Sequence, residues 1–541
     1  MRTHKTGVVV AGGGLAGMVA ALELLDAGED VLIIDKDVKE NFGGLARESF
    51  GGVHLIDTPQ QRRLGLRDTP DLALSDWLRC ANFGNLDANP RLWAEFYCHN
   101  SLEYIYHFLV SKGIRFLPLV NWTERGLHRP GNSVPRWHIA WGTGFEITDR
   151  LANALNRHPR RGHLDLWFEH EVSGFNLSNG EVRGVYGSYG SDKASFIVDA
   201  EHVVIASGGI CGGDLSVLRR NWYRPWGPPP EVILNGAHQF ADGMLLDQAA
   251  SQAGANLTHL DRQWHYASGV HHPANRRPND GLSLVPPRSA LWFNGEGARI
   301  MNPGPLVGYT DTRHLVDSVL HQPGGYSWQI LNWKIAIKEL AVSGCDYMTA
   351  FRYKNRLGLV QNLLFGNKEL VRRLLRECPE DFITAETLGE LADKMTSASL
   401  FGLKVDADRL KADVKAYDDQ IDRGKSFFND AQLRHILNFR SYRGDRIRIC
   451  NFQKIDDPKA RPLIAIREFI LSRKSLGGIE TDIDGRVLDS AGAPIKGLYA
   501  AGEAAGFGGG GIHGTGSLEG TFLGSCILNG QVVGRTIARG G

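Results

Sequence analysis

The most constraining feature of this chain is a glycine-rich turn near its beginning. Residues 8–35 read VVVAGGGLAGMVAALELLDAGEDVLIID, in which an apolar strand leads into Gly12-x-Gly14-x-x-Gly17 and an Ala-rich helix. A second apolar strand follows and ends in Asp35. Glycines at this spacing permit a tight turn, a close approach of backbone to a pyrophosphate and close packing of helix on strand, and the acid can accept hydrogen bonds from ribose hydroxyls. The sequence therefore predicts a βαβ unit that binds a dinucleotide.

Composition and charge exclude several classes of protein. A chain of 541 residues is too long for one ordinary core, so two or more domains are expected. Lys plus Arg number 61 against 60 for Asp plus Glu, so there is no basic field to attract nucleic acid. No apolar run reaches the roughly 18 residues of a membrane span. We therefore expect a globular protein with no nucleic-acid partner and no membrane span.

The seven cysteines are scattered, and none forms a CxxC pair. Zinc, iron–sulfur and c-type haem sites therefore have no sequence support, and we predict no metal site. An odd, unclustered cysteine count is typical of a reducing cytoplasm, and we expect the protein there.

Three later segments favour FAD over a nicotinamide dinucleotide. NFGGLARESFGG (41–52) places two glycine pairs soon after Asp35, and AEHVVIASGGI (200–210) reads as a buried strand that ends in glycines. PIKGLYAAGEAAG (494–506) reads as a further strand, after which Glu503 could hold ribityl hydroxyls. FAD extends across a protein, so its flavin half needs contacts distant in sequence from its adenine half. We also expect the last helix, from Leu518, to direct its positive end at the flavin.

These motifs, in this order, together with ADGMLLDQAASQAGA and SLGGIETDIDGRVL, resemble the FAD-dependent oxidoreductase 2 family. That family includes soluble fumarate reductases, succinate dehydrogenase flavoproteins and 3-ketosteroid Δ1-dehydrogenases, and the chain looks most similar to the predicted FAD-binding dehydrogenases grouped with the ketosteroid enzymes. The resemblance implies an α/β fold, in which a Rossmann-like FAD-binding domain carries an inserted α+β substrate (cap) domain. We place the FAD-binding domain at 1–259 and 462–541 and the cap at 260–461, with helices expected at 326–344, 369–378 and 406–424.

The glycine-rich segments and the resemblance together indicate the cofactor site. The residues expected there are Gly12, Gly14, Ala16, Gly17, Asp35, Lys36, Gly43, Gly44, Ala46, Ser49, Gly51, Gly52, Val172, Ala206, Gly208, Asp242, Glu503, Phe522 and Leu523. Relatives with covalent FAD carry a His where Leu45 stands here, so we predict non-covalent, dissociable FAD. A second nucleotide-binding unit is not recognisable, and we expect no tightly held NAD(P)H.

The resemblance offers two templates for the chemistry, and the chain departs from both. Fumarate reductases clamp a dicarboxylate with a His and an Arg, at whose positions this chain has Lys474 and Ser517. That change argues against a C4-dicarboxylate, although Lys474 or Arg299 could supply a charge. Ketosteroid dehydrogenases hold a 3-keto oxygen with a Tyr and a Gly N–H. Gly520 matches the donor glycine, but Gly516 stands at the Tyr position.

The catalytic candidates are Tyr326, Tyr442, Arg443, His513 and Gly520. A cap tyrosine beside an arginine could transfer a proton, and His513 could contact substrate or flavin, or be purely structural. Three functions stay open at this point. They are dehydrogenation of a hydrophobic, 3-ketosteroid-like ketone by hydride transfer to flavin N5, fumarate-reductase-like reduction of an activated double bond, and non-catalytic flavin binding or electron transfer. The expected partner is a small-molecule substrate, while the electron acceptor and the oligomeric state stay undetermined.

Overall fold

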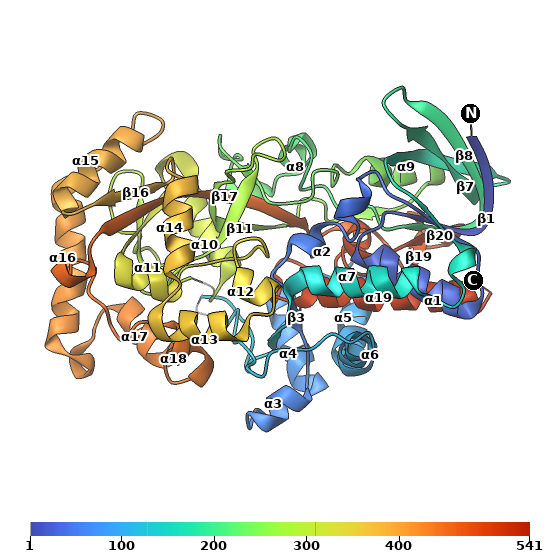
Figure 1. Ribbon diagram of the computed structural model, residues 1–541. Helices are drawn as coiled ribbons and strands as arrows, with labels where there is room; N and C mark the ends of the chain where they lie inside the picture. Colours follow the sequence, from blue (N-terminus) through green and yellow to red (C-terminus); the bar gives the residue numbers. More distant parts are fainter. Residues whose placement is uncertain (1, 127, 309, 541) are drawn as a thin grey trace.

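The computed structural model describes residues 2–126, 128–308 and 310–540, and two large β-sheets organise them (Figure 1). The first sheet has the strand order β19-β20-β8-β1-β2-β5, and β7 and β6 continue from β8. Its strands are β1 (Arg2–Ala11), β2 (Val31–Ile34), β5 (Leu164–Trp167), β6 (His170–Ser178), β7 (Glu181–Tyr189), β8 (Ala194–Ile205), β19 (Arg486–Leu488) and β20 (Pro494–Ala500). Strands β20, β8, β1, β2 and β5 pair in parallel, which confirms the predicted α/β fold class.

The first βαβ unit forms where the glycine fingerprint predicts it. β1 pairs with β2 from Val8 opposite Val31, and α1 (Leu15–Ala27) connects the two strands. A Cβ on Gly17 would lie 2.1 Å from the carbonyl oxygen of Gly12, so only glycine lets the helix approach the turn this closely. α1 packs against α19 (Thr521–Ala538) and α7 (Thr143–Asn156), and Figure 1 shows these three helices together along one side of the sheet.

The second sheet has the order β13-β14-β17-β11-β12-β15, and β16 and β9 also pair with β17. Its strands are β9 (Leu234–Asn235), β11 (Gln263–His271), β12 (Gly281–Val285), β13 (Leu291–Asn294), β14 (Tyr326–Asn332), β15 (Ala341–Val342), β16 (Phe382–Ala385) and β17 (Leu463–Ser475). Central strand β17 is buried along almost its whole length, as expected for a strand covered on both faces. In Figure 1 this sheet and its helices form the left part of the molecule.

The remaining elements cover the two sheets and connect them. On the first side they are β3 (Gly52–His54), β4 (Trp137–Ile139), α2 (Leu45–Glu48), α3 (Pro59–Arg63), α4 (Pro70–Ala81), α5 (Ala88–Asn100), α6 (Phe108–Ser111), α8 (Ser216–Arg220) and α9 (Met244–Ala253). The second side has α10 (Thr312–Leu320), α11 (Trp333–Glu339), α12 (Thr349–Arg352), α13 (Arg356–Phe365), α14 (Lys368–Glu377), α15 (Leu388–Ala398), α16 (Ala407–Arg423), α17 (Ala431–Phe439) and α18 (Arg443–Arg448). β10 (Leu257–Thr258) and β18 (Gly478–Ile479) pair between them. No helix among the described residues is long and apolar enough to cross a bilayer.

One secondary-structure expectation is wrong. The segment 326–344, expected to be helical, begins as strand β14, which is buried throughout and pairs with both β13 and β17. Aromatic residues favour strands, and pairing on two sides holds this segment in one, so the helix starts only at Trp333. The helices expected at 369–378 and 406–424 are confirmed as α14 and α16. β17 joins the second sheet although it follows residue 462, and the domain limits given above stay a prediction.

Candidate active site

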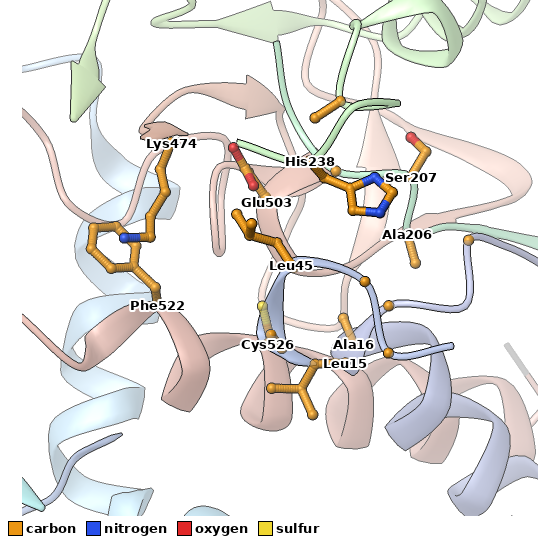
Figure 2. A pocket seen from close by; sticks show the side chains of 18 of the residues that line it. Leu15, Ala16, Leu45, Ala206, Ser207, His238, Lys474, Glu503, Phe522 and Cys526 are labelled. Carbon is orange, nitrogen blue, oxygen red and sulfur yellow. The ribbon is translucent and has the colours of Figure 1, made fainter. Parts of the chain in front are cut away.

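A cavity lies where the carboxyl ends of the parallel strands meet. Its volume is about 1640 Å³ when the solvent space at its open mouth is included. Ala11, Ile34, Ala206 and Ala501 end or follow β1, β2, β8 and β20, and all four line it. Ligands of open α/β sheets bind at this edge. Figure 2 shows Ala206, Ser207 and His238 on one side of the cavity, Lys474 and Phe522 on the other, and Glu503 and Leu45 between them.

Glycines keep the middle of the cavity open. A Cβ on Gly14 would have no neighbour nearer than 4.0 Å, and one on Gly44 or Gly208 would have none nearer than 3.5 Å. The backbone of Gly14 bridges to that of Gly43, so two glycine turns lie against each other. Side chains at these positions would project into the space that the turns leave free. The cradle therefore fits a ligand that runs close along the backbone, as a pyrophosphate does.

Acids dominate the end near β2. Asp35 accepts hydrogen bonds from the N–H groups of Gly13, at 2.7 Å, and Asp37, at 2.8 Å, and burial raises the pKa of its carboxyl. The ammonium of Lys36 lies 2.6 Å from Glu171 and 3.4 Å from Asp242. Because the charge of Lys36 is balanced by two acids, the described residues offer no free cation for a 2′-phosphate at this end, which suits an unphosphorylated ribose.

Glu503 lies near the middle of the cavity, just after β20. Its carboxylate accepts the N–H of Ser475 at 2.9 Å. Burial raises the pKa of Glu503 to about 7, because a charged carboxylate loses its hydration there. A carboxyl that is neutral or charged near pH 7 can donate to or accept from sugar-like hydroxyls.

A hydrogen-bonded chain of three polar side chains lines the other side. The ammonium of Lys474 donates to the hydroxyl oxygen of Tyr266 at 3.3 Å, and that hydroxyl donates to Oε1 of Glu519 at 2.9 Å. The indole N–H of Trp264 donates to the same oxygen at 2.9 Å. Burial lowers the pKa of Lys474 to about 8, although the charge of Glu519 opposes this shift. Near neutral pH these hydrogen-bonded side chains therefore hold a proton that can be exchanged.

Strand pairing brings these residues together. β11 and β17 are antiparallel neighbours with Trp264 opposite Lys474, so the two side chains share one face of the sheet. Tyr266 stands two residues further along β11, on the same face. Glu519 comes from the loop before α19, and the same end of α19 places the ring of Phe522 at 4.0 Å from the Lys474 ammonium.

Aromatic rings and a backbone N–H complete this side. Phe50 and Trp137 both line the cavity, and their rings stack at 6.0 Å. Gly520 has φ of +93°, and a Cβ there would lie 2.6 Å from Trp137, so this position requires glycine. Within the described residues nothing accepts the N–H of Gly520. It remains available to a ligand oxygen at the positive end of α19.

The structure places the expected cofactor residues consistently. All of them line the cavity except Gly17, which packs helix against turn. Their roles toward a cofactor stay predictions, but the residues do meet in one space. The last helix starts at Thr521, with Gly520, Phe522 and Leu523 on the cavity wall, so its N-terminal end faces the cavity.

Of the five catalytic candidates, only Gly520 lines the cavity. Tyr326 is fully buried in the second sheet, and its hydroxyl accepts the N–H of Leu400. The hydroxyl of Tyr442 donates to the carbonyl of Val120 at 2.5 Å, and burial raises its pKa to about 12. These tyrosines are therefore tied into the packing of the second side, and their positions do not support the expected proton transfer.

Arg443 and His513 also lie away from the cavity lining. Arg443 is exposed at the start of α18. His513 is fully buried, its Nε2 lies 2.8 Å from the hydroxyl of Thr521, and its ring stacks on Trp77 at 5.7 Å. Burial lowers the pKa of His513 to about 3, so the imidazole is neutral. The structural alternative fits His513 better than a catalytic one.

Neither Tyr266 nor Glu519 was predicted from the sequence as a site residue, and Lys474 was expected only as a departure from the dicarboxylate clamp. No local motif marks Tyr266, because its partners are far away in sequence and meet it only through strand pairing. Glu519 lies in the glycine-rich stretch before the last helix, where it was visible as one of few polar groups. His238 and Arg473 also line the cavity without having been predicted.

Comparisons with known proteins agree with this architecture. A family model described as an FAD binding domain matches residues 7–523. A KsdD-like steroid dehydrogenase of Mycobacterium tuberculosis is 38% identical over 548 residues, covering 98% of this chain and 95% of that protein.

Two solved structures have the same fold. One is a 3-ketosteroid Δ1-dehydrogenase from Sterolibacterium denitrificans in complex with 1,4-androstadiene-3,17-dione, with a TM-score of 0.72 at 17% identity over 99% of this chain and 100% of that one. The other is the open conformation of a flavocytochrome c3 fumarate reductase, with a TM-score of 0.68 at 22% identity over 99% of this chain and 78% of that one.

Proposed function

We propose a function from the premise that this chain belongs to the FAD binding domain family and has FAD as its cofactor. The protein is a dehydrogenase that oxidises a CH–CH bond next to the carbonyl of a hydrophobic, 3-ketosteroid-like substrate. The observation that carries this proposal is the hydrogen-bonded chain of Lys474, Tyr266 and Glu519 on the cavity wall. A dehydrogenase of this type needs a group that removes a proton from carbon. These three hydrogen-bonded side chains can provide that group.

The cavity suits FAD in three respects. The glycine cradle at Gly14 and Gly44 leaves room for a pyrophosphate, Asp35 could accept hydrogen bonds from ribose hydroxyls, and Glu503 could hold hydroxyls of the ribityl chain. When bound, FAD supplies the two-electron acceptor of the reaction. Leu45 has no atom able to bond covalently to it, so we propose that the cofactor is dissociable.

Tyr266 is our candidate for the proton acceptor. As its oxygen takes a proton from the substrate carbon, its own hydroxyl proton moves along the existing hydrogen bond to Oε1 of Glu519. The ammonium of Lys474, 3.3 Å from the same oxygen, stabilises negative charge there. Trp264 holds Glu519 in position through its indole N–H.

The carbonyl oxygen of the substrate needs donors as negative charge develops on it. The N–H of Gly520, the residue just before α19, has no acceptor among the described residues and lies at the positive end of the helix. Phe50 and Trp137 give this part of the cavity aromatic walls that suit an apolar ring system. A hydrophobic ketone has both a carbonyl oxygen for this N–H and an apolar body for these aromatic walls.

A C4-dicarboxylate fits less well. The carboxylate of Glu519 would repel it, and Ser517, at the place of the clamping Arg, is buried with its hydroxyl 3.1 Å from that of Thr521. Reduction of an acidic, activated double bond remains a second candidate, because Arg473 and Lys474 both line the cavity. A flavoprotein without turnover would have no use for a proton-transfer chain at its cofactor.

We also propose that the protein works in the cytoplasm. All seven cysteines are described, and each is a free thiol. Thiols that stay unpaired are typical of a reducing compartment.

Anaerobic titration of the FAD-loaded protein with 3-ketosteroids and simpler cyclic ketones tests the proposal. We expect the oxidised-flavin band to bleach with a 3-ketosteroid. If ketones leave the band unchanged while an unsaturated dicarboxylic acid reoxidises the chemically reduced protein, the reductive candidate is correct instead.

A further inference from the structure

Helix α13 (Arg356–Phe365) is apolar but largely exposed. No residue in it is buried, although its sequence RLGLVQNLLF is mostly hydrophobic. Leu357 is 78% exposed, Leu364 70% and Phe365 68%, and Val360 and Leu363 are exposed beside them. We call these five residues the α13 face. Leu357, Val360 and Leu364 follow helical spacing, so they form one continuous apolar stripe.

Such a patch is unusual on a protein that stands alone. Scattered apolar side chains are normal at a surface, but a contiguous group on one helix marks an interaction site. The α13 face cannot be explained as core, because none of the residues of α13 is buried.

Cationic side chains flank the α13 face in sequence. Lys354, Arg356, Lys368, Arg372 and Arg376 are exposed, whereas Glu369 is the single exposed acid from 353 to 376. Lys354 pairs with Glu146 and Arg376 with Glu377. Arg356 and Lys368, directly before and shortly after the stripe, form no ion pair with any described acid. The region therefore combines an apolar face with a positively charged rim.

This combination fits an anionic phospholipid surface. Apolar side chains of an interfacial helix enter the boundary between headgroups and acyl chains, and flanking Lys and Arg pair with lipid phosphates. A second copy of this chain would fit less well, because a two-fold interface would bring the same cations toward each other. Ten residues are too few to cross a bilayer, so α13 would lie along its surface.

The α13 face is also connected to the cavity. α12 directly precedes α13, and its Phe351 packs against Phe50 at 5.0 Å. Phe50 in turn stacks on Trp137, and both rings line the cavity. Ser343, shortly before α12, lines the cavity as well. Figure 1 shows α12 and α13 next to each other, with α12 close to α7 and β3.

We propose that the α13 face docks this protein on an anionic phospholipid bilayer, with the cavity wall of Phe50 and Trp137 close behind the docked helix. A lipid-soluble substrate would then reach the cavity from the membrane. Membrane binding itself does not depend on the proposed function. Delivery of substrate from the membrane rests on the proposed function.

Flotation of the FAD-loaded protein with vesicles tests the proposal. One set of vesicles contains phosphatidylcholine alone, and the other contains phosphatidylglycerol as well. We expect binding to both, with tighter binding to the anionic vesicles. L357S/L364S should reduce the partition coefficient about tenfold or more, because two exposed leucines no longer enter the lipid. The matched control is L86S/F427S, which removes apolar side chains that are 91% and 70% exposed in other parts of the chain.

A second pair of variants separates charge from apolar contact. R356E/K368E should remove the preference for phosphatidylglycerol while the protein stays folded. Unchanged partitioning of L357S/L364S overturns the proposal. So does a concentration-dependent dimer, seen by sedimentation velocity, that L357S/L364S dissociates, because a second copy then covers the face. The rate of flavin bleaching by a water-soluble ketone, measured without vesicles, should be equal in all variants. A failure of the proposed function would appear as absent bleaching, and a failure of membrane docking as unchanged partitioning.

Discussion

Replacing Lys474 by Met tests the proposed proton transfer most directly. The ammonium donates to the Tyr266 oxygen at 3.3 Å, and Met is similar in length but has neither charge nor donor. A hydrogen bond from a charged group contributes about 1.5–3 kcal/mol. Because about 1.4 kcal/mol corresponds to a tenfold change in rate, we expect flavin reduction by a 3-ketosteroid to slow about 10- to 100-fold.

The pH dependence gives an independent readout of the same group. Burial lowers the pKa of Lys474 to about 8, so the ammonium that stabilises charge on Tyr266 is present below that pH and is lost above it. The rate of the wild-type protein should therefore fall as pH rises through about 8. Lys474→Met should lack this fall. Lys474→Arg keeps a charge that does not titrate in this range, so it should stay active to higher pH.

Stopped-flow measurement of flavin bleaching under anaerobic conditions, as a function of pH, is the assay. Asp418 provides the control, since burial raises its pKa to about 6 although it does not line the cavity. Asp418→Asn should keep the wild-type fall in rate. If Lys474→Met keeps that fall, or slows the reaction by less than threefold, Lys474 does not act on Tyr266 as we reason.

Three further predictions concern the tyrosines, the glycine cradle and the core. Tyr266→Phe should slow flavin reduction at least tenfold, whereas Tyr442→Phe should leave the rate unchanged and reduce stability by about 1 kcal/mol, measured by urea unfolding, since it loses one backbone hydrogen bond. Gly14→Ala should weaken FAD retention on gel filtration without lowering the Tm of the apo-protein, but Gly17→Ala should lower that Tm, because its Cβ would lie 2.1 Å from a backbone oxygen. Arg136→Ala should destabilise the protein by about 3–5 kcal/mol in urea, since it leaves the buried carboxylate of Asp68 without its cation and that of Asp76 with Arg79 alone; a loss under 1 kcal/mol would contradict that reasoning.

The cofactor side of the cavity was predictable because its determinants are local. Gly12, Gly14 and Gly17 specify a turn and a close helix by their own lack of a Cβ, and Asp35 follows at a fixed distance along the same βαβ unit. Gly208 and Gly209 likewise come shortly after β8, whose last residues, Val203 to Ile205, are apolar. The order of parallel strands then brings all these ends to one edge. Short-range chemistry and simple topology were sufficient there.

The substrate side was not predictable for a geometric reason. β11 and β17 pair in antiparallel fashion with Trp264 opposite Lys474, but the register shifts before Tyr266, which lies opposite Leu471. One extra residue on β17 makes the shift, and such bulges redirect side chains near active sites. A slip of one residue moves every side chain of a strand to the other face.

Whether Lys474 reaches the cavity therefore depends on the register of two strands separated by about 200 residues in sequence, and no local pattern encodes it. The cap tyrosines Tyr326 and Tyr442 illustrate the same limit from the other direction. Their residue type suits proton transfer, but one is enclosed between strands and the other bonds to a loop carbonyl. Chemistry at this site is set by which face a strand presents. Tyr266 is the tyrosine that the bulged pair of β11 and β17 presents to the cavity.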